Sequence, residues 1–223
     1  MKRLYLYDDA KARSFEPFAL TRPVSELRAG AELIRLRWER VAGIKAYGFI
    51  GAGHLANFEE LDAPPAISTE TTIPAGSVIV NSRFVASLAA SLDDITPAFS
   101  CDGRVCAVHI RKSIDSAGFQ DGSIELDSLV DANAAPIAGR WLNDVWNLVS
   151  DLSAQLSDDI PLIGAALSGA AIENATIIGR KQIYCETGVG IEPFVVLDAT
   201  DGPILIRRGA TIASFSRIVG PCY

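Results

Sequence analysis

The sequence has few of the residues that bind metals or form disulfides. It contains four cysteines and two histidines in 223 residues, and no two cysteines are spaced as Cys-x-x-Cys. A structural zinc site therefore has no support, and we expect small buried thiols rather than disulfides. Apolar runs that could span a membrane and a signal peptide are missing as well. We therefore expect a cytoplasmic protein.

Motifs of several common enzyme classes are also missing. The glycines at 51 and 53 are too few for a dinucleotide-binding fingerprint, which needs three spaced glycines and an acidic partner. The sequence has no Ser-His-Asp order, no Cys-His pair and no His-Glu-x-x-His stretch. Covalent hydrolysis and zinc proteolysis therefore have no support.

Charge is present but unevenly distributed. The net charge is −7, which argues against a nucleic-acid partner. Residues 1–45 nevertheless carry ten Lys/Arg against six Asp/Glu, a local charge of +4. A basic region inside an acidic protein suits a small anionic ligand. Three of its arginines, Arg35, Arg37 and Arg40, are expected on a solvated helix face.

The hydrophobic pattern predicts an α/β fold in the first part of the chain. Strands are expected at residues 2–7, 44–50, 77–81 and 105–111, and helices at 25–41, 54–61, 84–92 and 141–156. This alternation favours a mainly parallel sheet with helices on both faces.

A different period begins at residue 172. Apolar residues then recur at every sixth position, with one residue missing near Ile183 and one excursion at 198–203. A six-residue period is typical of a hexapeptide parallel β-helix. We therefore expect an α/β domain at 1–156, a linker at 157–171 and β-helix coils at 172–223. Because the repeat runs to Tyr223 without a cap, we expect a chain cut within the repeat.

Polar residues follow the predicted strands, at the sheet edge where α/β proteins bind ligands. Asp8 and Asp9 follow the first strand, His54 follows the second, and Asn81 and Arg83 lie at the end of strand 77–81. The aspartates could hold Mg²⁺, which takes one or two carboxylates together with substrate phosphates. Equally, an aspartate at a strand end can cap the following turn.

Three arginines after the first strand are candidate phosphate ligands. Arg13, Arg22 and Arg28 could each make bidentate contacts to phosphate oxygens. A structural role on a solvated surface is the alternative.

Residues 7–39, YDDAKARSFEPFALTRPVSELRAGAELIRLRWE, resemble the N-terminal segment of a divergent sugar nucleotidyltransferase family. The shared features are Asp8-Asp9, Arg13, Thr21-Arg22-Pro23-Val24, Leu27-Arg28-x-Gly30 and Trp38-Glu39. VIVNSR, WLNDVWNLVSDL and VLDATDGPILIRRGATI match later parts of the family. Its members carry a left-handed β-helix and are similar to the bifunctional N-acetylglucosamine-1-phosphate uridyltransferase and glucosamine-1-phosphate acetyltransferase.

The resemblance implies a Rossmann-like nucleotidyltransferase domain with a mainly parallel sheet, followed by a short left-handed parallel β-helix. It also implies a reaction in which a sugar 1-phosphate and a nucleoside triphosphate give a nucleotide sugar, such as UDP-N-acetylglucosamine, and pyrophosphate. Mg²⁺ would be the cofactor, and a homotrimer could form through the β-helix. Arg13 and Arg22 would be catalytic; the nucleotide and substrate ligands would be Asp8, Asp9, Thr21, Arg28, Asn81 and Arg83.

The sequence departs from the wider superfamily at three places. The loop DDAKAR stands where G-x-G-T-R is typical, Phe18 stands where a lysine follows proline, and Asn81 precedes Ser82 where a magnesium-binding aspartate is typical. Either arginine side chains replace backbone amides at the phosphates, or catalysis is lost. The alternative function is therefore an inactive sugar-nucleotide-binding or regulatory domain on a β-helix oligomerisation scaffold. Because residues 172–223 contain no histidine, we expect no acetyl transfer.

Overall fold

The computed structural model describes residues 2–130 and 133–223. Its contacts divide the chain into two compact units, Met1–Leu148 and Val149–Tyr223. The division into 1–156, 157–171 and 172–223 stays a prediction. Each unit has its own hydrophobic core, so each is described by itself.

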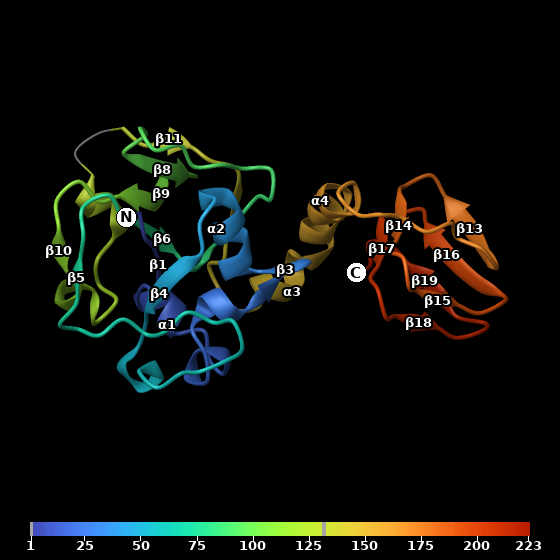
Figure 1. Ribbon diagram of the computed structural model, residues 1–223, viewed down its shortest axis with the longest axis horizontal. Helices are drawn as coiled ribbons and strands as arrows, with labels where there is room; N and C mark the ends of the chain where they lie inside the picture. The colour runs from blue at the N-terminus through green and yellow to red at the C-terminus, as the bar shows by residue number, and fades with distance from the viewer. Residues whose placement is uncertain (1, 131–132) are drawn as a thin grey trace. The chain divides into compact units, whose positions relative to one another are not determined.

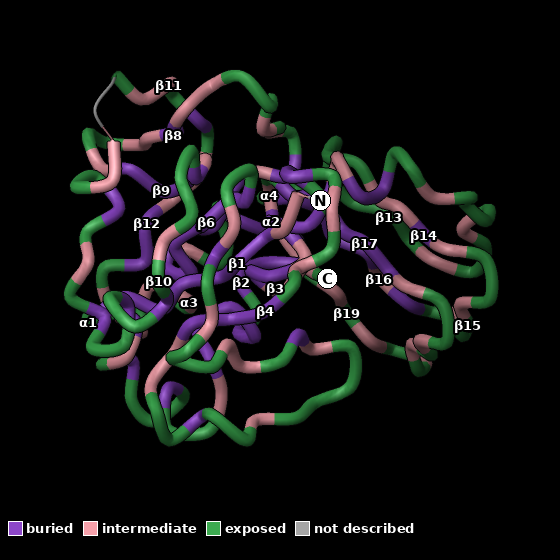
Figure 2. Tube along the Cα trace, turned by 60° about the vertical axis from the view of Figure 1, so that its left-hand side comes forward, coloured by how far each residue is buried: buried purple, intermediate pink, exposed green. Residues whose placement is uncertain are grey.

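A six-stranded sheet forms the centre of the first unit (Figure 1). Its strand order is β11 (Ala135–Pro136), β8 (Ala98–Cys101), β9 (Arg104–His109), β6 (Val78–Asn81), β1 (Leu4–Tyr7) and β4 (Ala46–Ile50). β1 is parallel to both β4 and β6, while β9 is antiparallel to β6 and β8. The mixed α/β fold with a mainly parallel sheet is thereby confirmed. Figure 2 shows the central strands buried along their length.

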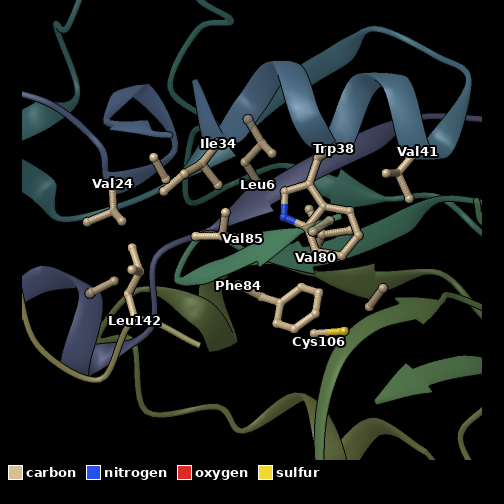
Figure 3. Packing of buried hydrophobic residues seen from close by; sticks show 14 of the residues in the cluster. Leu6, Val24, Ile34, Trp38, Val41, Val80, Phe84, Val85, Cys106 and Leu142 are labelled. Carbon is tan, nitrogen blue, oxygen red and sulfur yellow. The ribbon is translucent and has the colours of Figure 1, made fainter. Parts of the chain in front are cut away.

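One face of this sheet is covered by helix α2 (Ile34–Ala42). Figure 3 shows Trp38 pointing from α2 toward the strands, near Phe84 and Val80. The Trp38 and Phe84 rings lie 5.7 Å apart, and Trp38 Nε1 donates to the Asn81 carbonyl at 3.2 Å. A large aromatic ring with a satisfied N–H is well suited to this fully buried position.

The predicted helix at 25–41 begins nine residues later than expected. The segment before it contains η2 (Val24–Glu26) and a short antiparallel pair, β2 (Arg28–Ala29) and β3 (Glu32–Leu33). Gly30 lies in the turn between these strands with φ 66°, a conformation that glycine adopts without strain. This turn, rather than a helix, occupies the first half of the segment.

The prediction that three arginines line a solvated face is wrong for two of them. Arg35 is buried and donates to Glu26 Oε1 at 2.7 Å and to Glu39 Oε1 at 3.2 Å. Arg37 is fully buried, and its Nε donates to the Ala29 carbonyl at 3.1 Å. A guanidinium can be buried when carboxylates or carbonyls meet its N–H groups, which the hydrophobic pattern does not reveal.

Among the described residues, no α-helix covers the opposite face of the sheet, contrary to the prediction. Short 3₁₀ turns, η4 (Ser116–Phe119) and η5 (Leu126–Leu129), lie there with the strand pair β5 (Thr72–Ile73) and β10 (Ile114–Asp115). The ring of Tyr7 meets the ring of Phe119 edge to face, 5.1 Å between centroids.

Two other predicted helices are absent from the described residues. Residues 84–92 begin as strand β7 (Phe84–Ala86), which pairs with β12 (Gly139–Trp141). Residues 54–61 contain only the end of a 3₁₀ turn, η3 (Gly53–Leu55). Short apolar runs of this kind do not distinguish a strand from a helix.

A helix connects the first unit to the repeats of the second. The structure has helix α3 (Asn147–Ser150) and then α4 (Leu152–Gly164) where a helix at 141–156 and a loose connector were expected. Leu156, Ile160 and Ile163 form the buried face of α4, which explains why it continues past the predicted end. None of the described helices is long and apolar enough to cross a membrane.

The strands of the second unit stack in parallel, as in a β-helix. The stacks are β13 (Ala175–Gly179), β16 (Val195–Ala199) and β19 (Arg217–Val219); β14 (Ile183–Cys185) and β17 (Ile204–Ile206); and β15 (Gly190–Ile191) and β18 (Thr211–Ile212). Ile183 pairs with Ile204 and Gly190 with Thr211. Both steps are 21 residues long, so one coil consists of three strands and their turns.

Replacement of Trp38 tests the packing of α2 on the sheet. We expect Trp38→Ala to lower the free energy of unfolding by about 3–5 kcal/mol, because a large buried aromatic side chain is lost. Trp146 is 64% exposed, so Trp146→Ala is the matched control with an expected change within about 0.5 kcal/mol. Guanidinium unfolding followed by circular dichroism measures both. Equal losses would contradict the packing described above.

Candidate active site

The polar residues predicted to follow the strands do meet at one edge of the sheet. Tyr7 lies opposite Asn81 in the parallel register of β1 and β6. The next residues are fixed by backbone hydrogen bonds, from Asp8 N to the Ile50 carbonyl and from Ser82 N to the Tyr7 carbonyl, both 2.9 Å. The carboxyl ends of three neighbouring strands therefore form this edge.

Asp9 is held by a buried ion pair. Arg83 Nε donates to Asp9 Oδ1 at 2.7 Å, and Arg83 Nη2 donates to Asp9 Oδ2 at 2.5 Å. Asn81 Nδ2 reaches the same carboxylate at 2.8 Å, and the amide of Ala12 donates to it at 2.8 Å. Burial raises the pKa of Asp9, but Arg83 and the other donors outweigh burial and hold it below its ordinary value.

Three predicted substrate ligands, Asp9, Asn81 and Arg83, therefore bind one another. Asp9 also caps the short helix α1 (Ala10–Arg13), as the alternative interpretation of the sequence had it. The remaining guanidinium nitrogen of Arg83 donates to the Leu142 carbonyl at 2.9 Å. This arrangement connects β1, β6 and the segment after β12.

Asp8 has a different environment from its neighbour. Its side chain is buried, and its Oδ2 accepts from the amide of Val24 at 3.2 Å. Its Oδ1 has no hydrogen-bond partner among the described residues, and neither do the buried hydroxyls of Ser25 and Ser82. Burial raises the pKa of Asp8 to about 6, although the Val24 amide and the charge of Arg13 partly oppose this. A site with unsatisfied oxygens thus lies behind the sheet edge.

The backbone amides of Ala10 and Arg13, in the segment after β1, already have hydrogen-bond partners. The amide of Ala10 donates to the Gly122 carbonyl at 2.8 Å, and the amide of Arg13 donates to the Asp9 carbonyl at 3.1 Å. Gly122 has φ 78°, and a Cβ there would lie 2.7 Å from the nitrogen of Ala10. Gly122, which is distant in sequence, therefore packs directly against the backbone of the loop. In this conformation these amides are not free to bind phosphate.

Arg13 fastens the same segment. Its Nε donates to the Asp8 carbonyl at 2.9 Å and its Nη2 to the Phe119 carbonyl at 3.0 Å, and Nη1 bonds to the Gln120 carbonyl. A guanidinium with three of its donor groups on backbone carbonyls is a structural clamp. The structure places Arg13 at the loop, with each of its nitrogens facing the protein.

An open pocket of ≈ 460 Å³ lies beside this edge, between residues 20–22 and 54–60. Thr21, Arg22 and His54 contribute to its lining, and His54 Nε2 is 3.0 Å from the Ala19 carbonyl. Arg22 Nη2 lies 3.4 Å from Glu60 Oε1, and both side chains are about two-fifths exposed. An exposed ion pair of this length is weak, so Arg22 can exchange Glu60 for another anion.

Residues adjacent in sequence to the two walls of this pocket lie close to Asp8. Val24, whose amide binds Asp8, follows the wall at 20–22. Gly51, which precedes the other wall, lies so close that an added Cβ would be 3.6 Å from Asp8 Oδ2. Val24 and Gly51 therefore connect the two walls to the Asp8 carboxylate, although Asp8 itself does not line the pocket.

The remaining predictions differ in outcome. Arg28 lies on β2, bonds to the Ala31 carbonyl and is not among the pocket residues. Within residues 2–130 and 133–223, no group of three His, Cys, Asp or Glu side chains could hold a metal ion by itself. Sequence reasoning missed Ser82 and Glu60, although Ser82 stands between two residues that it did select. It also missed Gly122, for which the sequence carries no local signal.

Comparison with known proteins gives a family match that includes these residues. A family model described as sugar nucleotidyl transferase matches residues 4–166. The match covers all strands of the six-stranded sheet and both walls of the pocket. No curated protein matches the chain.

Removal of Arg83 tests the buried ion pair. We expect Arg83→Met to lower the free energy of unfolding by about 3–5 kcal/mol, because it leaves the Asp9 carboxylate buried without its counter-ion. The double variant Asp9→Asn/Arg83→Met removes both charges and is expected to recover part of this loss. Denaturant unfolding of the wild type, Asp9→Asn, Arg83→Met and the double variant gives the coupling energy. Strictly additive losses would show that the two side chains do not depend on each other.

The raised pKa of Asp8 predicts a pH-dependent difference in stability. The folded value of about 6 exceeds that of an unfolded aspartate, about 4, so the folded chain holds an extra proton between these values. Through this group, stability falls as pH rises from about 4 to about 6. Asp8→Asn removes this effect. The unfolding free energy of the variant, relative to that of the wild type, should therefore rise by about 2–3 kcal/mol between pH 4 and pH 6.

Unfolding free energies of both proteins at pH 4, 5, 6 and 7 measure this difference, in which contributions from other groups cancel. Asp62 is exposed, and Asp62→Asn is the control for the loss of one carboxylate charge at the surface. A constant difference between Asp8→Asn and wild type would contradict the assignment.

Proposed function

The chain belongs to the sugar nucleotidyl transferase family, and from this premise we propose that it joins a nucleoside triphosphate to a sugar 1-phosphate. A phosphate oxygen of the sugar attacks the α-phosphorus, the bond from the α-phosphorus to the bridging oxygen breaks, and pyrophosphate leaves. The protein's tasks in such a transfer are to hold the two substrates in line and to stabilise negative charge. The observation that carries the proposal is the open pocket beside Asp8, within the matched residues.

Arg22 is the proposed cation for the triphosphate. It lines the pocket, is partly exposed and has only a 3.4 Å contact to Glu60. A guanidinium can bind phosphate oxygens in a bidentate way. Thr21, its neighbour, adds a hydroxyl on the same wall. Arg13 is assigned a positioning role, because its nitrogens hold the loop between β1 and α1.

Asp8 is the proposed protein ligand for Mg²⁺. Its Oδ1 is a carboxylate oxygen without a partner among the described residues. Mg²⁺ takes few protein carboxylates and completes its shell with water and substrate phosphates, so a single aspartate fits. The bound ion would neutralise phosphate charge during the transfer. Asp9 is not assigned to the ion, because Arg83 and Asn81 occupy its oxygens.

The finer parts of the assignment rest on resemblance. We propose an amino-sugar phosphate as substrate and a nucleotide sugar such as UDP-N-acetylglucosamine as product, by similarity to the bifunctional uridyltransferase and acetyltransferase. The parallel stacks of the second unit support a short β-helix, which we propose to be left-handed and to form a homotrimer. Acetyl transfer is not proposed, because residues 172–223 contain no histidine base.

A second candidate is a domain that binds nucleotide sugars without turnover. The specific observation in its favour is that the amides of Ala10 and Arg13 already have partners, so the loop lacks the backbone phosphate cradle of typical transferases. Binding of a nucleotide sugar in calorimetry, with no pyrophosphate released under any condition, would support this candidate over catalysis.

Pyrophosphate release with Mg²⁺ tests the proposed reaction. Each common nucleoside triphosphate is paired with hexose and amino-hexose 1-phosphates, with Mg²⁺ and with chelator. Under the working pair we expect Arg22→Gln to lower kcat/KM by about 10²-fold or more, because a charged group that stabilises the transferring phosphates is lost. Arg40 is also exposed, and Arg40→Gln is the matched control with less than about a twofold change. Equal effects of the two variants on kcat/KM would show that Arg22 has no specific role in the reaction.

A further inference from the structure

A second pocket lies at the opposite edge of the sheet from Asp8. His109, the last residue of β9, pairs with Val78, the first residue of β6. The pocket beside it therefore lies near the amino end of β6, whereas the candidate active site lies at the carboxyl end. Its volume is ≈ 370 Å³, which is within the range of small-molecule sites.

The floor of this pocket is apolar and fixed. Ile110 is buried, donates its amide to the Ser77 carbonyl at 2.8 Å and accepts from the Gly76 amide at 2.7 Å. Ile114, on β10, and Leu129, at the end of η5, line the same space. All three pack with the hydrophobic cluster on the Tyr5 and Tyr7 face of the sheet. A ligand here would meet a preformed hydrocarbon surface.

The rim carries uncommitted nitrogen groups. Arg111 and Lys112 are exposed, and in the described part of the chain neither side chain has a hydrogen bond or ion pair. His109 also lines the pocket, and its Nε2 is buried without a partner in the same part of the chain. A buried polar atom of this kind is ordinarily satisfied.

Several other basic side chains of this unit are already bound. Arg35 and Arg83 bind carboxylates, and Arg13 binds carbonyls. Lys2, which lies near His109, is paired with Asp94. Arg111 and Lys112 are thus two adjacent cations at the mouth of an apolar pocket, without a partner among the described residues, in a chain of net charge −7.

We propose that this pocket is a second ligand site, which binds a small organic anion. The phosphate or carboxylate of the ligand meets the guanidinium of Arg111 and the ammonium of Lys112, which supply charge-assisted hydrogen bonds. Its carbon skeleton contacts Ile110, Ile114 and Leu129. The site does not depend on the proposed transferase reaction, because it shares no residue with the pocket at Arg22.

Methyl-resolved NMR of the full chain tests this site. Phenyl phosphate and benzoate are titrated separately, so that phosphate and carboxylate are distinguished, and benzyl alcohol is the neutral comparison. We expect saturable shifts of the Ile110 and Ile114 methyl signals with one of the anions. Benzyl alcohol should bind at least about tenfold more weakly, because it makes no charge-assisted contact.

A matched pair of double variants gives the decisive comparison. Arg111→Gln/Lys112→Gln is expected to weaken binding of the anion at least about tenfold. Arg180→Gln/Lys181→Gln removes the same charge from an exposed Arg-Lys pair of the second unit, and we expect less than about a twofold change. All four substitutions are at exposed positions, and thermal unfolding verifies that each protein is folded.

Three results would overturn the proposal. One is the lack of a saturable shift at Ile114 with either anion up to about 20 mM, well above the dissociation constant of a millimolar site. Another is equal weakening by both double variants, which would show that net charge rather than this pocket attracts the anion. The third is benzyl alcohol binding as tightly as the anions.

Discussion

The buried ion pair between Asp9 and Arg83 is the interaction on which the candidate active-site edge depends. Its partners come from the ends of β1 and β6, and Arg83 also reaches the Leu142 carbonyl. The Arg83 guanidinium lies 5.4 Å from the centre of the Trp141 ring. Buried charges are tolerated only when pairing and hydrogen bonds replace lost water. The pair therefore holds together the segments that follow β1 and β6, and Asp8 lies directly before Asp9 at the end of β1.

The loop after β1 shows how a nucleotidyltransferase fold can be built without a glycine-rich turn. Its helix cap is the Asp9 side chain, its clamp is Arg13, and its close backbone approach comes from Gly122, more than a hundred residues away. These contacts stabilise the loop, but they occupy the backbone amides that a phosphate would need as donors. Side chains would then have to supply the contacts to phosphate, which is why Arg22, with its exposed 3.4 Å contact to Glu60, is the proposed cation.

The sequence predicts features that depend on local periodicity and misses those that depend on distant partners. The strands ending at Tyr7, Ile50 and Asn81 follow from short apolar runs. The six-residue period indicates the parallel stacks of the second unit. The sequence predicts a helix at residues 84–86 because it does not show their strand partner β12, over fifty residues later. It also predicts Arg35 and Arg37 in solvent, because charge alone does not reveal Glu26 or the Ala29 carbonyl.

Asp8 and Asp9 are adjacent in sequence, and the sequence pattern alone could not assign them different roles. The Arg83 charge and three hydrogen-bond donors keep Asp9 ionised, while burial raises the pKa of Asp8 to about 6. The charge of Asp9 itself contributes to the rise at Asp8, and Arg83 neutralises much of that charge. The ion pair therefore limits the increase in the pKa of Asp8, and it also occupies the carboxylate oxygens of Asp9. The consequence is that one carboxylate is committed to the fold, while the Oδ1 atom of the other has no hydrogen-bond partner among the described residues.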